Sequence, residues 1–201
     1  MDFIRKIENA DYLFIVFAGG GELGTGIRDT LGLFTSQNLT LSALFNVPMP
    51  SNYTPYGCPD EEKRKSLLAN AESRADEIVE TVSNRGRFID STNTSAFEAW
   101  IHPGMLYRLG YKQINTFDKS FYADESCNGC SICQKVCPVD NITMSDNRPV
   151  WHNRCQQCYA CLQWCPRQSI QAGKKTVGID RYHNPHITVN DIIAASEEYG
   201  E

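Results

Sequence analysis

The sequence lacks several features that would mark other classes of protein. It has no apolar run near the ~20 residues of a membrane span, and no run of basic residues. Its pI of about 5.4 is acidic, which argues against nucleic-acid binding. The N-terminus has neither a long apolar stretch nor a small-residue cleavage site, so nothing there predicts export. The four histidines form no ligand-spaced pair with a carboxylate, and no acid–base dyad or nucleophile constellation is present.

Cysteine, by contrast, is abundant, and eight of the nine cysteines fall into two copies of one pattern. Each copy reads C-x-x-C-x-x-C-x-x-x-C-P, and the copies lie 28 residues apart. The first consists of Cys127, Cys130, Cys133 and Cys137, followed by Pro138, and the second of Cys155, Cys158, Cys161 and Cys165, followed by Pro166. This spacing is typical of bacterial ferredoxins. It predicts two [4Fe–4S] clusters as cofactors and one-electron transfer at low potential.

The spacing also predicts which cysteines share a cluster. Three cysteines at two-residue gaps wrap three corners of one cube, and the fourth cysteine of each copy ligates the other cluster. We therefore expect cluster I on Cys127, Cys130, Cys133 and Cys165, and cluster II on Cys155, Cys158, Cys161 and Cys137. A proline after each crossing cysteine redirects the chain, because proline fixes φ and has no amide donor.

Two other uses of cysteine fit the pattern less well. Zinc takes four ligands, typically as two C-x-x-C pairs at longer separation, and leaves the third cysteine of each triplet without a role. Disulfides require an oxidising compartment. Eight thiolate ligands point instead to a reducing cytoplasm. The ninth cysteine, Cys58, precedes a predicted helix and is either an inert or a redox-active thiol.

The duplication extends beyond the cysteines. Ile142 and Ile170 occupy the same position in each copy and are expected to form an apolar wall over each cluster. Residues 141–151 read as a hairpin with Asp146-Asn147 at its turn. Such a repeat predicts two-fold pseudo-symmetry in which neither half closes alone.

The N-terminal part predicts an α/β fold with parallel strands. The apolar run 12–17 is expected to be a strand buried on both faces, followed by a glycine loop, a helix and a second strand at 41–47. A long helix then starts after Asp60 as N-cap and ends at Gly86. Gly19, Gly21 and Gly24 spell G-x-G-x-x-G, but the second strand does not end in the acidic residue that a dinucleotide fold needs. The loop suits either an anionic or hydrogen-bonding ligand or a tight turn.

These segments resemble a known family. The 12–17 strand with its glycine loop, the segment Val47-Pro48-Met49-Pro50-Ser51-Asn52-Tyr53 and the charged helix after it are similar to the later part of a flavodoxin-like domain. The two cysteine runs with Arg181-Tyr182-His183-Asn184-Pro185 resemble the dicluster ferredoxin half of flavodoxin–ferredoxin fusion proteins of anaerobic prokaryotes. The resemblance implies FMN as a candidate cofactor, with contacts from Gly19, Gly20, Gly21, Asn52 and Tyr53.

The chain departs from that family at its start. It has no S/T-x-T-G-N-T loop to hold the flavin phosphate and begins near the helix before the fourth strand. The two remaining strands would form half a sheet with an open edge. The chain is then a truncated or split product, or a partner chain completes the sheet, or the half-domain is a docking platform.

The predicted organisation is a partial flavodoxin-like α/β segment at 1–86, a connector with a helical pattern at 87–119, an α+β dicluster ferredoxin domain at 120–175 and a C-terminal extension at 176–201. The predicted function is that of an electron carrier serving redox partner proteins. The alternative is an electron-transfer component of a larger flavin- or metal-dependent oxidoreductase, with the N-terminal half used for flavin contact or docking.

Overall fold

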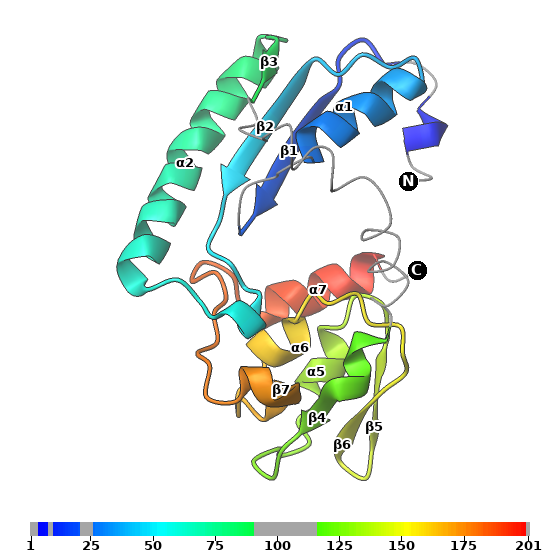
Figure 1. Cartoon of the computed structure of the whole chain (residues 1–201), viewed down its shortest axis with the longest axis vertical. Coiled ribbons are helices and arrows are strands. Elements are labelled where there is room, and N and C mark those ends of the chain that lie inside the picture. Colours follow the sequence, from blue (N-terminus) through cyan, green and yellow to red (C-terminus); the bar gives the residue numbers. More distant parts are fainter. Residues whose placement is uncertain (1–3, 8–9, 21–25, 91–115, 200–201) are drawn as a thin grey trace. The chain divides into compact units, whose positions relative to one another are not determined.

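A computed structural model describes residues 4–7, 10–20, 26–90 and 116–199 (Figure 1). The chain divides into two compact units. The first contains Met1–Pro50 and Pro59–Gly104, and the second contains Ser51–Cys58 and Met105–Glu201. Most of the predicted connector, including its helical pattern, lies outside the described residues. Among those described, no helix combines the length and the apolar character needed to cross a membrane.

The N-terminal unit is a parallel sheet with helices, as the sequence predicts. Strands β1 (Phe14–Gly19), β2 (Ala43–Pro48) and β3 (Phe88–Ile89) pair in the order β1-β2-β3. Helix α1 (Gly26–Ser36) links β1 to β2, and helix α2 (Glu61–Ser83) lies between β2 and β3 in the chain. A short 3-10 helix, η1 (Ile4–Lys6), precedes the sheet. Asp60 caps α2 by accepting a 2.8 Å hydrogen bond from the Lys63 amide.

Two features of this sheet differ from the expectation. The strand at 12–17 is not buried on both faces: in β1 the side chains of Phe14 and Val16 are 46% and 42% exposed. Alternate residues of β1 face solvent because the core of the unit gathers around β2. The third strand, β3, was not predicted, because two residues carry no readable alternation.

Long-range contacts hold β3 in place. The guanidinium of Arg74, from α2, lies over the rings of Phe45 and Phe88 at 5.6 and 5.0 Å from their centroids. Its Nη2 donates to both carboxylate oxygens of Asp90, the residue after β3. Asp90 in turn accepts a 2.6 Å hydrogen bond from the Asn46 amide in β2. Arg74 therefore connects the helix, the central strand and the end of β3.

The second unit is a small α+β fold. Strands β4 (Phe121–Ala123) and β7 (Ile170–Ala172) form one antiparallel pair, and β5 (Ile142–Ser145) and β6 (Arg148–Trp151) form the predicted hairpin. Asp146 and Asn147 both have positive φ at its turn, as a two-residue type I′ hairpin requires. The helices are α5 (Ile132–Lys135), α6 (Ala160–Gln163), α7 (Val189–Tyr199) and the 3-10 turns η2 (Thr54–Tyr56), η3 (Phe117–Ser120) and η4 (Gly173–Thr176).

The predicted two-fold repeat is visible in the backbone. Helix α6 begins 28 residues after α5, and β7 begins 28 residues after β5. The left-handed residue before α5, Ser131, has its equivalent in Tyr159 before α6. The Asp124 amide donates to the Ser169 carbonyl, and the His152 amide donates to the Asn141 carbonyl at the equivalent positions. Each such bond joins one half of the repeat to the other, which explains why neither half closes alone.

The segment 51–58 packs within the second unit. The Gln163 side-chain nitrogen donates to the Asn52 carbonyl at 2.6 Å and to Thr54 Oγ1 at 2.8 Å. The ring of Tyr53 meets that of Tyr159 edge-on, with centroids 4.9 Å apart. The structure thus groups this segment with the cysteine repeats, whereas the predicted first domain runs unbroken from 1 to 86. The predicted domain limits stay a prediction.

Candidate metal centres

A cavity in the second unit collects four cysteines from both copies of the pattern. Cys127, Cys130 and Cys133 line it together with Cys165, the last cysteine of the other copy. The remaining lining is mostly apolar or hydroxyl-bearing: Asn128, Ser131, Ile132, Met144, Pro166, Ser169 and Ile170. The structure thus brings together the four residues that the sequence assigns to cluster I.

The other four cysteines are also close enough to influence one another. Burial, above all, raises the pKa of the Cys161 thiol, and charges on Cys158, Cys155, Cys133 and Cys137 raise it further. Cys137 likewise raises the pKa of Cys158, after the larger effect of burial. The crossing cysteine of the first copy therefore lies within electrostatic reach of the second triplet.

Left-handed residues give each cysteine triplet its curvature. In the first loop Gly129 and Ser131 have φ of 70° and 62°, and in the second Gln157 and Tyr159 have φ of 57° and 58°. Each reversal is followed at once by a short helix, which buries the third cysteine of the triplet. The loops are therefore set by backbone conformation as well as by cysteine spacing.

Polar hydrogens are directed at several of the sulfurs. The Asn141 amide donates to Cys137 Sγ at 3.3 Å, and the Gln157 amide donates to Cys155 Sγ at 3.3 Å. Ser169 Oγ lies 3.2 Å from Cys165 Sγ. Such hydrogen bonds favour thiolate over thiol and tune the potential of a cluster held by those sulfurs.

The cysteines fit an iron–sulfur cluster in their acid–base chemistry. Burial raises the pKa of Cys133 to about 11, opposed by a hydrogen bond from the Gln134 amide. Thiols in such surroundings would stay protonated near neutral pH, so several thiolates together need a nearby positive charge. The irons of a bound cluster would supply that charge. Among the described residues, no three ligand-type side chains converge on a single ion position, whereas in a cubane each cysteine binds its own iron.

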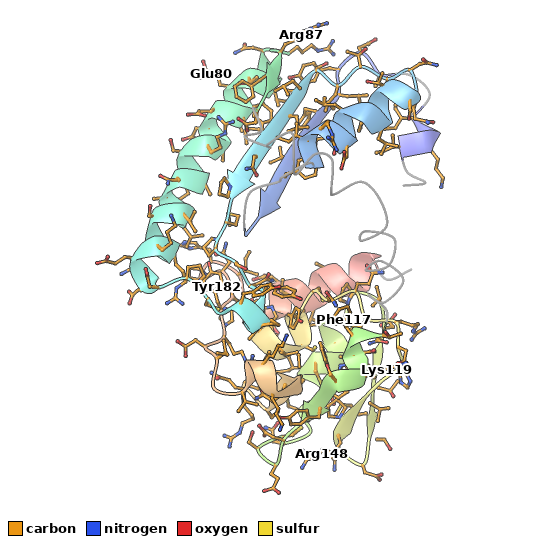
Figure 2. All side chains as sticks on the ribbon, in the orientation of Figure 1. Glu80, Arg87, Phe117, Lys119, Arg148 and Tyr182 are labelled. Atoms are coloured by element: carbon orange, nitrogen blue, oxygen red, sulfur yellow. The ribbon has the colours of Figure 1, made fainter. Side chains whose placement is uncertain are left out.

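The apolar surroundings come from the predicted pair of isoleucines. Ile142 and Ile170 are buried in one core cluster with Phe121, Tyr159 and Leu162. Arg148 lies at the start of β6 (Figure 2). It connects the hairpin to this core by donating to the carbonyls of Ala123 and Asp124, just before the first triplet. The cysteine loops are therefore fixed to the sheets on which they depend.

The residues expected to contact flavin are spread over both units. Gly19 ends β1 and Gly20 follows it, while Gly21 lies outside the described residues. Asn52 and Tyr53 belong to the second unit. Flavin contact by these five residues stays a prediction.

Sequence reasoning gave no role to two charged side chains and did not predict one hollow. Asp118 and Arg181 lie near the cysteines, and although Arg181 belongs to the segment that resembles the ferredoxin family, that resemblance assigns it no task. In the N-terminal unit a hollow of about 400 Å³ opens at the end of β2, lined by Asn46, Val47, Pro48, Leu67, Asn70, Ala71, Arg74 and Asp90. Cys58, the ninth cysteine, donates to the Asp180 carbonyl at 3.4 Å.

Comparison with known proteins places one part of the chain. Residues 126–170 match the family model of the 4Fe-4S dicluster domain. The match implies two [4Fe–4S] clusters, and it suggests electron transfer. No curated protein and no solved structure matches the chain. No flavodoxin family matches either, so the likeness of the N-terminal unit to a flavodoxin half stays a prediction.

Proposed function

We propose that the protein is an electron carrier whose clusters accept and donate single electrons at low potential. Cluster I is held by Cys127, Cys130, Cys133 and Cys165, and cluster II by Cys155, Cys158, Cys161 and Cys137. The observation that carries this proposal is the cavity that joins the first triplet to Cys165 from the other copy. When bound, the clusters supply reversible one-electron chemistry.

The chain's own residues have three tasks in such a carrier. Asn141 and Gln157 donate hydrogen bonds to ligand sulfurs. The buried isoleucines keep water away, which strengthens electrostatic control of the potential. Helices α5 and α6 pack against each other, so the two cysteine loops lie close together. By surface area Cys130 and Cys158 are the exposed members of their triplets, although protein atoms crowd the Cys158 sulfur enough to raise its pKa. We propose the surfaces around them as the contact points for redox partners.

The charge distribution bears on those partners. The chain's 24 acidic and 19 basic residues divide into 14 and nine in the N-terminal unit and ten and ten in the second unit. The net negative charge thus comes from the N-terminal unit. Any electrostatic steering toward a basic partner would act through that unit.

Iron analysis and ligand variants test the proposal. Anaerobically purified protein should contain about eight irons per chain, with matching acid-labile sulfide. Cys137→Ala should lose cluster II and keep cluster I, and Cys165→Ala should do the reverse, as followed by EPR after dithionite reduction. Four or fewer irons in the unmodified chain would refute the two-cluster proposal. Loss of the same cluster in both variants would refute the crossed ligation.

The second candidate is an electron-transfer component of a larger oxidoreductase. The observation favouring it is β1, which in the described part of the chain pairs on one side only and exposes Phe14 and Val16. An open apolar edge suits a partner strand. Light scattering over a range of concentrations, alone and with FMN, tests self-association at this edge, and Val16→Lys should abolish any association. If the chain stays monomeric and binds no FMN, the result contradicts the component role and favours the carrier role.

A further inference from the structure

A buried carboxylate lies beside the ligands assigned to cluster II. Asp118 is 3% exposed, and its Oδ2 accepts from Asn141 Nδ2 at 2.8 Å and from the Asn153 amide at 2.9 Å. Asn141 itself donates to Cys137 Sγ, and Asn153 precedes Cys155 by two residues. Both neighbours donate to Oδ2, whereas Oδ1 is buried and has no hydrogen-bond partner among the described residues. Asp118 is therefore linked to Cys137 through Asn141, and its charge also acts on Cys155, a second ligand assigned to the same cluster.

The equivalent positions around cluster I carry no buried carboxylate in the part of the chain that the structure describes. The repeat replaces Asn141 by Ser169, whose neutral hydroxyl faces Cys165. It replaces Asp118 by Asp146, which is exposed in the hairpin turn. The electrostatic surroundings of the two ligand sets therefore differ, although their cysteine spacing is identical.

A cation lies on the cluster I side instead. Arg181 Nη2 donates to the Ile170 carbonyl and to Gln171 Oε1, both at 2.9 Å, and Ile170 lines the cavity that contains Cys165. Its Nε and Nη1 are buried without a hydrogen-bond partner among the described residues. Burial lowers the pKa of Arg181, and the charge of Cys165 is the largest influence that raises it, ahead of Cys58 and of the cluster II ligand Cys161. The guanidinium charge therefore acts more strongly on the Cys165 side, which is cluster I.

The other charges next to the cysteine loops act more weakly. The cations Lys135, Arg154 and Arg167 and the anions Glu125 and Asp140 are exposed, and Asp124, before the first triplet, is only partly buried, so water and salt screen them. An added electron makes a cluster more negative, so a nearby anion disfavours reduction and a nearby cation favours it. The buried pair should therefore dominate the difference between the two sites.

Resting on the proposed function and its ligand sets, we infer that Asp118 and Arg181 make the reduction potentials of the two clusters different. Cluster II then has the more negative potential. Electrons then collect on cluster I. This assigns the chain a direction of internal electron flow, from the loop beside Asp118 to the loop beside Arg181. Both residues act as positioned charges and ligate no iron.

Potentiometric titration of the full chain, followed by EPR, tests the inference. Two midpoints are expected in the unmodified protein. Asp118→Asn should raise only the more negative midpoint, that of cluster II. At a fixed potential the ratio of reduced to oxidised cluster II should increase about tenfold, which corresponds to 59 mV for a one-electron couple. Asp146→Asn is the matched control: it removes the same charge at the equivalent exposed position and should change that ratio less than about twofold.

Arg181→Gln provides an independent arm and should lower the less negative midpoint, with the exposed Arg167→Gln as its control. A single shared midpoint in the unmodified protein would overturn the inference, as would Asp118→Asn moving both midpoints equally. If Asp118→Asn loses iron, the Arg181→Gln result decides. The iron content distinguishes failure of the proposed function from failure of this inference. Four or fewer irons in the unmodified chain refutes the proposed function, whereas about eight irons with a single midpoint refutes only the difference between the two potentials.

Discussion

Replacing Gly129 by alanine should weaken the second unit more than a positive φ alone would. Gly129 has φ of +70°, and a Cβ built there would lie 2.9 Å from Asn147 Cβ and 3.0 Å from the Asn147 carbonyl oxygen. The hairpin turn thus packs directly on the first cysteine loop. At the equivalent position of the second loop, Gln157 adopts φ of 57° with a side chain. The conformation therefore tolerates a side chain, and it is the close approach that requires glycine.

Gly178 is the matched control, because its φ is +72° and nothing lies within 4 Å of a Cβ built there. Left-handed backbone costs an L-residue about 1–2 kcal/mol, which is the whole cost expected for Gly178→Ala. Overpacking adds about 1–3 kcal/mol for Gly129→Ala. The total for Gly129→Ala is then about 2–5 kcal/mol of unfolding free energy.

The assay is anaerobic guanidinium unfolding, followed by loss of the iron–sulfur absorbance. Gly129→Ala should lower the midpoint clearly more than Gly178→Ala does. Adding Asn147→Gly to Gly129→Ala should restore part of the lost unfolding free energy, because it removes the Asn147 Cβ that the new side chain meets. Glycine also suits the φ of 59° at that turn position. Equal midpoints for the two alanine variants would refute the reasoning, since the hairpin turn would then not constrain the loop.

Three further predictions concern the cores of the two units. Gln163→Leu removes the donor to Thr54 Oγ1 and to the Asn52 carbonyl, and should lower the unfolding free energy by roughly 2–4 kcal/mol. Residues 51–58 should then become accessible to limited proteolysis. An unchanged cleavage pattern would contradict this role of Gln163. Arg74→Ala should lower the thermal midpoint by removing the contacts to Asp90, whereas Lys65→Ala, which breaks an exposed ion pair, should change it little; equal effects would contradict the bridging role of Arg74. Iron chelation in air should abolish the dispersed NMR signals of residues 116–199 and leave those of the N-terminal unit unchanged. The reason is that the two units have separate cores and only the second depends on the clusters. Loss of both sets of signals would contradict this.

The main elements of the N-terminal unit were predictable because each has a strong local signal. The run 41–47 is apolar enough to be a buried strand, and Asp60 followed by acidic residues marks a helix start. The short strand β3 has no such signal and exists because Arg74 and Asp90 attach it to β2. The exposure of β1 also escaped prediction, since an apolar run by itself does not indicate how many of its faces are covered.

By itself, the sequence determined the cofactor chemistry, because the spacing of cysteines along a short loop is a local property that suits one kind of cluster. It also determined the repeat, the β5–β6 hairpin and the parallel α/β character of the N-terminal unit. Only the tertiary structure placed Asp118 and Arg181 beside different cysteine loops, packed 51–58 against Gln163, and brought Asn147 onto Gly129. These contacts join residues distant in the chain, so they depend on the packing of the whole unit. That packing makes two loops of identical cysteine spacing electrostatically unequal.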